Sequence, residues 1–331
     1  ARSVWDEGTP WSWVNELFEP AYDRIMPGRE IAMERMPVFA QTGIRRVVHG
    51  AITHPPAGTW RLGASGVSTR WWCGGSQGGS AWGPGAGKYL AQWMVHGAAD
   101  ISMASFDPRR FGARIDDAYR IEKAKEDYLL RHEIPFPQLD RPGCRPSHSK
   151  TSPLYQKLAQ QGAVYQDVYG WERPYWYARN DMPRAHIHAF RRSALHDVIG
   201  HEVTDLRAGA GIADLSAFSK LEIHGADVET FLERVSSNKL PRSTGAISLT
   251  YFVNPKGRLE GEATCVRLSA NRFYLVYAAV KEAALLDWLR SQRQTGERVD
   301  FDNISETCGV LMLAGPKSRE ILARCTPVAL D

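Results

Sequence analysis

A glycine-rich stretch at residues 74–87 has the composition of a loop that could hold a ligand. Glycine lacks a Cβ, so its backbone amide can approach a bound group closely. A helix that begins after such a loop points the positive end of its dipole at an anionic or electron-rich atom. No acidic residue follows at the distance expected for a ribose partner, so a flexible connection remains the alternative. The glycines concerned are Gly74, Gly75, Gly78 and Gly79.

Histidines and nucleophiles offer weaker patterns. His186 and His188 form one close pair, and His196 and His201 form another, but neither pair has a third ligand in a recognised spacing. We therefore expect ordinary surface or core histidines and no metal site. No placed base accompanies a serine or cysteine nucleophile, which argues against acyl transfer.

Several helices and strands must position these residues. The helix after the glycine-rich stretch carries Leu90, Trp93 and Met94 on one side, at the spacing that buries one helical face. Residues 107–153 contain a charged helix and then a loop rich in proline and basic residues, which is typical of a connector. The patterns predict strands at residues 45–48, 263–268, 272–278 and 309–313, the last of them buried, and helices at residues 88–96, 115–132 and 281–292.

The clearest periodicity lies within residues 211–238. Leu221 and Ile223 alternate with polar residues, Lys220 among them, as in a half-buried strand. A helix is predicted to follow, and its apolar residues share one face: Val228, Phe231, Leu232 and Val235. This pattern predicts a packed α+β fold.

Length and composition exclude several classes of protein. The 331 residues are enough for two domains, and the net charge of +4 is spread along the chain without the basic block typical of nucleic-acid binding. Five cysteines without a CxxC pair favour reduced thiols in a reducing compartment. The sequence has no apolar signal core and no membrane-spanning run. We expect no nucleic-acid or membrane partner, and a cytoplasmic location or, in a eukaryote, the mitochondrial matrix.

Residues 211–238 resemble the start of the folate-binding domain of the glycine-cleavage T-protein family. In that family, the segment aligned with residues 251–264 presents an acidic residue to the reacting nitrogens of tetrahydrofolate. The resemblance implies that Glu262, where T-protein relatives have Asp, handles a proton at an amine while a methylene unit is exchanged. It also implies that Tyr251 stacks on the pterin. A solvated strand carboxylate and a packed strand aromatic are the alternatives.

A second resemblance lies in residues 72–97 and 107–112, which look like the end of the flavin domain in dimethylglycine and sarcosine dehydrogenases. In that family this loop and helix lie against the flavin. Further segments match the family in the same order, at residues 34–37, 50–55, 152–155, 169–178 and 313–320. The resemblance implies that FAD is contacted by Gly74, Gly75, Gly78, Gly79 and Trp82.

This family resemblance covers nearly the whole chain and predicts three parts. They are the C-terminal part of a flavin and substrate domain at residues 1–106, a connector at 107–153, and the N-terminal part of a T-protein-like folate domain at 154–331. The GxGxxG turn that holds the dinucleotide in the family is not found before Thr69. We therefore expect a middle section, either a fragment or one piece of an assembly in which a second chain supplies the flavin-binding segment.

The resemblance implies flavin-dependent oxidative demethylation of a small N-methyl amine, of the dimethylglycine or sarcosine type, with one-carbon transfer to tetrahydrofolate. The implied cofactors are FAD and tetrahydrofolate. Two alternatives stay open: a folate-binding or aminomethyltransferase-like module without redox activity, and a structural subunit that completes another chain. The glycine-rich stretch discriminates between the demethylating enzyme and the folate-binding module, because a pure folate module would have no use for it.

Overall fold

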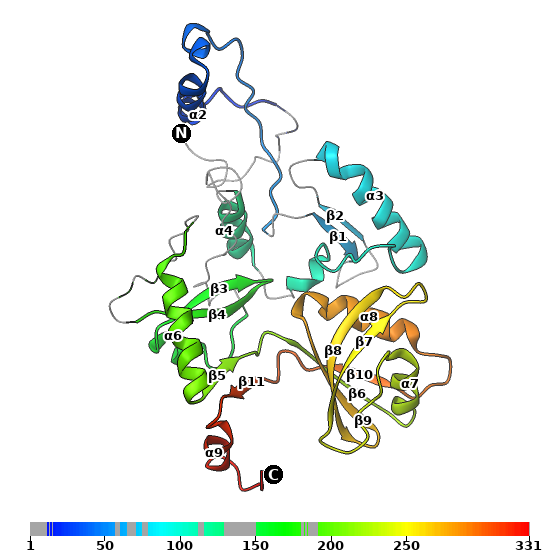
Figure 1. The fold of residues 1–331 in the computed structure, drawn as a ribbon. Coiled ribbons are helices and arrows are strands. Elements are labelled where there is room, and N and C mark those ends of the chain that lie inside the picture. Colours follow the sequence, from blue (N-terminus) through cyan, green and yellow to red (C-terminus); the bar gives the residue numbers. More distant parts are fainter. Residues whose placement is uncertain are drawn as a thin grey trace.

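The computed structural model describes residues 12, 14, 16–56, 60–64, 71–74, 79–111, 116–128, 150–179, 182, 184 and 191–330. Its largest sheet is antiparallel and has five strands in the order β10-β6-β9-β8-β7 (Figure 1). The strands are β6 (Ser219–His224), β7 (Ile247–Val253), β8 (Leu259–Ser269), β9 (Arg272–Tyr277) and β10 (Asp300–Asn303). Helices and strands mix throughout the described residues, which confirms the α+β class.

The core of this C-terminal part lies between one face of the sheet and two helices, α7 (Val228–Val235) and α8 (Glu282–Gln292). Leu221 and Ile223 of β6 are 0% exposed and pack in one cluster with the apolar face of α7. The buried residues of α7 are the four predicted from the spacing: Val228, Phe231, Leu232 and Val235. One expectation was wrong. Lys220 is 0% exposed, because its ammonium donates to the Ser216 carbonyl at 2.7 Å and so keeps a partner when buried.

A second, smaller core lies in the N-terminal half. The antiparallel hairpin of β1 (Arg61–Ala64) and β2 (Trp71–Gly74) precedes the long helix α3 (Gly79–His96). Trp60, Leu62 and Met103 form the buried centre, and Leu90 and Trp93 of α3 pack against it. These contacts hold α3 beside the hairpin (Figure 1).

Helix α3 differs from the prediction in where it begins and in one residue of its apolar face. It begins at Gly79, so the second half of the glycine-rich stretch is helical and not a loop. Glycine disfavours helix, but Ala86 and Tyr89 also pack on the small core, and such tertiary contacts override propensity. Met94, predicted on the packed side, is 51% exposed.

The remaining described elements flank these two cores. Helix α4 (Asp117–Tyr128) is held by a hydrogen bond from the Tyr119 hydroxyl to Asp167 of β3 (Ala163–Val168) at 2.7 Å. Trp176 of β4 (Trp171–Tyr177) packs on Leu195 of α6 (Ala194–Ala208). The elements are α2 (Tyr22–Arg35), η1 (Pro37–Gln41), η2 (Pro108–Phe111), α4 (Asp117–Tyr128), α5 (Tyr155–Gln160), β3 (Ala163–Val168), β4 (Trp171–Tyr177), α6 (Ala194–Ala208), β5 (Gly211–Asp214), η4 (Ala279–Lys281), β11 (Leu311–Ala314) and α9 (Ser318–Ala323).

Two predicted strands need correction. Residues 45–48 form no strand. Val48 is 60% exposed, so its β-branched side chain lacks the packing against neighbouring strands that favours β structure. The strand predicted at 309–313 is β11; among the described strands its one partner is β5, and Leu311 is 53% exposed instead of buried. Most of the predicted connector loop at 135–153 lies outside the described residues. No helix among the described residues is long and apolar enough to cross a bilayer.

The cysteines of the C-terminal part should differ sharply in reactivity. Cys265 lies in the core at 0% exposed, and burial raises the pKa of its thiol to about 12, whereas Cys308 and Cys325 are exposed. Because the thiolate is the reacting form, iodoacetamide at about pH 8 should modify Cys308 and Cys325 and spare Cys265. Peptide mass spectrometry of the folded and the denatured protein measures this. Equal labelling of Cys265 in both states would contradict the burial.

Candidate functional site

Tyr251 and Glu262, the two residues predicted to meet folate, lie on the neighbouring strands β7 and β8. They are direct partners in the antiparallel register, so their side chains project from the same face of the sheet. The next residues along each strand, Phe252 and Ala263, are 0% and 1% exposed and face the core. Tyr251 and Glu262 therefore share the face that α7 and α8 leave open, and both are exposed to solvent.

Gly261 explains why β8 lies so close to helix α8 at this point. A Cβ on Gly261 would come within 2.9 Å of Cδ1 of Leu285, a residue of α8 that is 1% exposed. A larger residue at 261 would push α8 away from the strand. Gly261 therefore faces α8, while its neighbour Glu262 projects from the opposite, open face of the sheet.

A cavity of about 490 Å³ opens on the face that carries Glu262. This volume is in the range of small-molecule and cofactor sites. Glu262 lines the cavity, whereas Tyr251 is not among the described residues that do. The loop after β5, the strands β7 to β9 and the segment before β11 supply most of its apolar wall, formed by Leu215, Phe218, Leu249, Leu259, Val276 and Val310.

The cavity also carries charges of both signs. Glu260 lines it beside Glu262 and accepts a hydrogen bond from Asn254 Nδ2 at 2.8 Å. Lys281 lines the same cavity and donates to Ser102 Oγ at 2.8 Å. Burial lowers the pKa of Lys281, and Glu260 partly offsets that effect. An apolar wall with two carboxylates and one amine can hold a flat polar ring and exchange protons with its nitrogens.

The residues predicted to meet flavin lie in the other half of the molecule. Gly74 ends β2 and pairs with Arg61, Gly79 begins α3, and Trp82 on the first turns of α3 is 52% exposed. Gly75 and Gly78 lie outside the described residues. Two of the predicted contacts, Gly74 and Gly79, therefore lie at the end of β2 and the start of α3. They belong to a different part of the fold from the pair formed by Tyr251 and Glu262.

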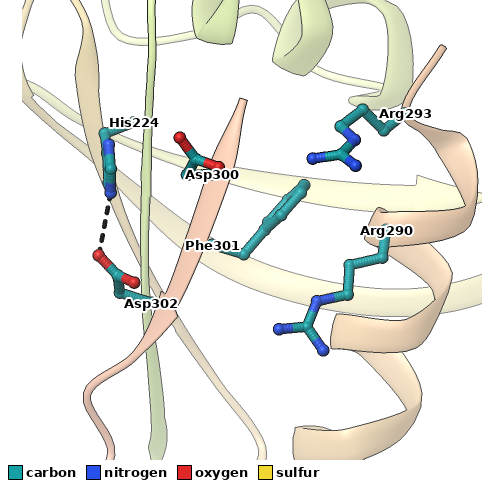
Figure 2. Close-up of a pocket in the computed structure, with 6 residues that line it drawn as sticks. All are labelled: His224, Arg290, Arg293, Asp300, Phe301 and Asp302. Atoms are coloured by element: carbon teal, nitrogen blue, oxygen red, sulfur yellow. Dashed lines mark hydrogen bonds and ion pairs between the residues drawn. The ribbon is translucent and has the colours of Figure 1, made fainter. Parts of the chain in front are cut away.

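A second cavity, of about 460 Å³, lies where strand β10 meets the end of α8 (Figure 2). Phe301 extends toward the helix that carries Arg290 and Arg293, while His224 and Asp302 face each other at 2.9 Å. Arg293 donates to the Val299 carbonyl at 3.1 Å. This cavity contains none of the residues singled out in the sequence.

The structure describes one of the two histidine pairs. His196 and His201 are exposed on α6, and His186 and His188 lie outside the described residues. Within the part of the chain that is described, no group of three His, Cys, Asp or Glu side chains could hold a metal ion.

The hairpin that brings Tyr251 and Glu262 together was missed at the sequence level, because β7 was not predicted. Its turn reads Asn254-Pro-Lys-Gly257, and Gly257 has a φ of +73°, a conformation that favours glycine. A turn of this composition between alternating residues indicates a hairpin. The turn was the signal that could have found the register.

Two family models match this chain in sequence order. Residues 154–331 match the GCVT N-terminal domain. The chain belongs to the GCVT domain family. In the same chain, residues 96–149 match the FAD dependent oxidoreductase central domain. The GCVT match contains the whole five-stranded sheet and the cavity with Glu262, and the oxidoreductase match begins at the last residue of α3.

Individual relatives confirm the resemblance to dimethylglycine and sarcosine dehydrogenases. Human mitochondrial dimethylglycine dehydrogenase is 32% identical over 321 residues, which are 96% of this chain and 37% of that protein. Human mitochondrial sarcosine dehydrogenase is 28% identical, over 92% of this chain and 38% of that protein. The glycine cleavage aminomethyltransferase T of Bartonella henselae aligns with a TM-score of 0.43 at 24% identity, over 53% of this chain and 43% of that one. This GCVT-family chain thus spans little more than a third of the length of the curated relatives it matches.

Proposed function

We propose that this chain takes part in flavin-dependent oxidative demethylation of a small N-methyl amine, with transfer of the released carbon to tetrahydrofolate. The division of labour follows three parts: residues 1–106 serve the flavin and substrate, 107–153 connect, and 154–331 bind folate. The dimethylglycine or sarcosine type of amine is inferred from the names of the relatives. The same names favour the mitochondrial matrix if the organism is a eukaryote, and the cytoplasm otherwise.

The overall reaction balances with the two cofactors of this proposal. When bound, FAD would supply the two-electron oxidant for the N-methyl group, and loss of a hydride would bring that carbon to the oxidation level of formaldehyde as an iminium. When bound, tetrahydrofolate supplies the nitrogen atoms that take up this carbon as the amine departs. Protons must be removed from and returned to nitrogen during the exchange, and a carboxylate can hold them.

The observation that carries the proposal is the cavity of about 490 Å³ that holds Glu262 within the GCVT match. Its apolar wall suits a flat pterin, and the Glu260 and Glu262 carboxylates can accept hydrogen bonds from ring N–H groups. Glu262 stands at the cavity surface, where it can hold or move a proton at a ring nitrogen. Tyr251, its partner across the hairpin, borders the same face and could stack on a ligand that extends beyond the cavity.

The fit to FAD is partial. Gly74 and Gly79 border the gap before α3, and the first turn of α3 holds no acidic side chain that would oppose an electron-rich atom at its positive end. No GxGxxG turn for the pyrophosphate occurs before Thr69. We therefore place only the flavin end of FAD at this chain, with a further segment or a second chain holding the rest.

Two measurements on the purified chain test the proposal. We expect tetrahydrofolate to quench the tryptophan fluorescence saturably, and the absorbance spectrum after desalting to show no stoichiometric flavin until the segment that holds the dinucleotide is present. Folate binding with no flavin, even when that segment is added, would favour the module without redox activity. Failure to bind folate would reject the proposal and leave the structural subunit.

A further inference from the structure

The turn between β7 and β8 is held rigidly by its own hydrogen bonds. Asn254 Oδ1 accepts from the backbone amides of Lys256 at 2.9 Å and Arg258 at 3.1 Å, and the Asn254 amide donates to the Arg258 carbonyl at 2.9 Å. Asn254 Nδ2 donates to Glu260, which lines the cavity. A displacement of this turn would therefore move Glu260, and Glu262 follows two residues later on the same strand.

Asp100, in the segment that follows α3, accepts hydrogen bonds from this turn although it lies outside the five-stranded sheet. One carboxylate oxygen accepts from Lys256 Nζ at 3.2 Å, and the Asp100 carbonyl accepts from Arg258 Nη1 at 2.7 Å. Asp100 is itself held by Gln92 of α3, whose side chain donates to its other carboxylate oxygen at 2.8 Å and accepts from its amide at 3.0 Å. The hydrogen bonds from Lys256 and Gln92 lower the pKa of Asp100, so it is a carboxylate at neutral pH.

The same segment touches the cavity at a second point. Ser102, two residues after Asp100, accepts a hydrogen bond from Lys281, which lines the cavity on the side of η4. Segment 100–102 therefore reaches two parts of the cavity lining, Glu260 through the turn and Lys281 directly. Figure 1 shows α3 and the chain that follows it beside the tips of β7 and β8.

We propose that Asp100 is a positioning residue that fixes the β7–β8 turn, and with it the cavity carboxylates Glu260 and Glu262, against helix α3. For the effect on folate this inference rests on the function proposed above. A single exposed ion pair between Lys256 and Asp100 would contribute little. Here two hydrogen bonds join Asp100 to the turn and two more fix Asp100 on Gln92, so both sides of the contact are already ordered and little further entropy is lost.

The test compares Asp100→Ala with a matched control. The control, Asp287→Asn, changes another carboxylate between the same two parts: Asp287 of α8 pairs with Arg109 at 2.7 Å, and its side chain is 47% exposed, against 49% for Asp100. Arg109 keeps its second partner, Asp107, in this variant. Neither substitution removes a core side chain, so both proteins should fold.

Hydrogen exchange of the amides in residues 254–262 is the first readout. We expect Asp100→Ala to speed exchange there about fivefold and Asp287→Asn to leave it unchanged. Salt from about 0.05 M to about 0.5 M should speed exchange at the turn in the parent protein but not in Asp100→Ala, because only the parent has the charge contact to screen. Unchanged exchange in Asp100→Ala, or the same change in Asp287→Asn, would overturn the inference.

Tetrahydrofolate affinity is the second readout. We expect about fivefold weaker binding in Asp100→Ala, and Asp100→Ala combined with Lys256→Ala should cost less than the sum of the two single effects. Additive effects would show that Asp100 does not act through the turn. If the parent protein binds no folate, the proposed function fails, and the exchange experiment still decides whether Asp100 positions the turn.

Discussion

Replacing Glu262 with Gln is expected to lower methylene transfer to tetrahydrofolate about a hundredfold in a flavin-loaded preparation, while amine oxidation continues. Gln keeps the size of the side chain and its place in the cavity wall but cannot hold a proton at a folate nitrogen. The carbon that is not captured should appear as formaldehyde. Parallel assays of electron transfer to a dye, of formaldehyde and of methylene-folate measure the separation of the two activities.

Glu260 provides the matched comparison for this experiment. It lines the same cavity, but its carboxylate is already engaged by Asn254 at 2.8 Å, so Glu260→Gln should reduce transfer far less. A larger loss in Glu260→Gln would move the proton-handling role to that residue. Unchanged transfer in Glu262→Gln would show that Glu262 is a solvated strand carboxylate.

Gly225→Ala is expected to destabilise the sheet domain by roughly 3 to 5 kcal/mol. Gly225 joins β6 to α7 with a φ of +135°, which side chains rarely adopt, and an added Cβ would collide with the backbone carbonyl oxygen of Arg298. Backbone atoms cannot rotate away as a flexible side chain can, so the strand or the helix must shift. Urea denaturation followed by tryptophan fluorescence measures the loss.

Gly245→Ala is the control, because Gly245 also has a positive φ, +84°, but an added Cβ would meet nothing within 4 Å. Its cost should be only about 1 kcal/mol, the strain of the backbone conformation alone. If both substitutions cost the same, the close approach of Arg298 to Gly225 does not exist in solution.

The elements best predicted from the sequence are those whose local pattern and tertiary environment agree. Strand β6 and helix α7 have one apolar face each, and both faces are buried in the same core. Lys220 departs from that pattern because one carbonyl, Ser216, makes its burial tolerable. Whether a lysine finds such a hydrogen-bond partner depends on the tertiary structure, and the spacing of residues in the sequence does not indicate it.

The candidate site was only partly predictable for a related reason. The family resemblance pointed to Glu262, and a hairpin register places Tyr251 opposite it. The cavity needs more: Phe218 comes from the loop after β5, and Val310 comes from the segment before β11. The hydrogen bond from Arg258 to the Asp100 carbonyl joins residues that are 158 positions apart. Contacts over such separations leave no local periodicity to read.

The order of strands in the large sheet also has a consequence for how the chain folds during synthesis. The hairpins β7–β8 and β8–β9 join neighbours in sequence and can form as soon as they leave the ribosome. Strand β6 is synthesised before these hairpins, yet its partners are β9 and β10. His224 can therefore pair only after Arg272, on one side, and Asp300, on the other, have been synthesised. Until then β6 presents two unpaired edges and an apolar face, and this interval is when a nascent chain would depend most on a chaperone.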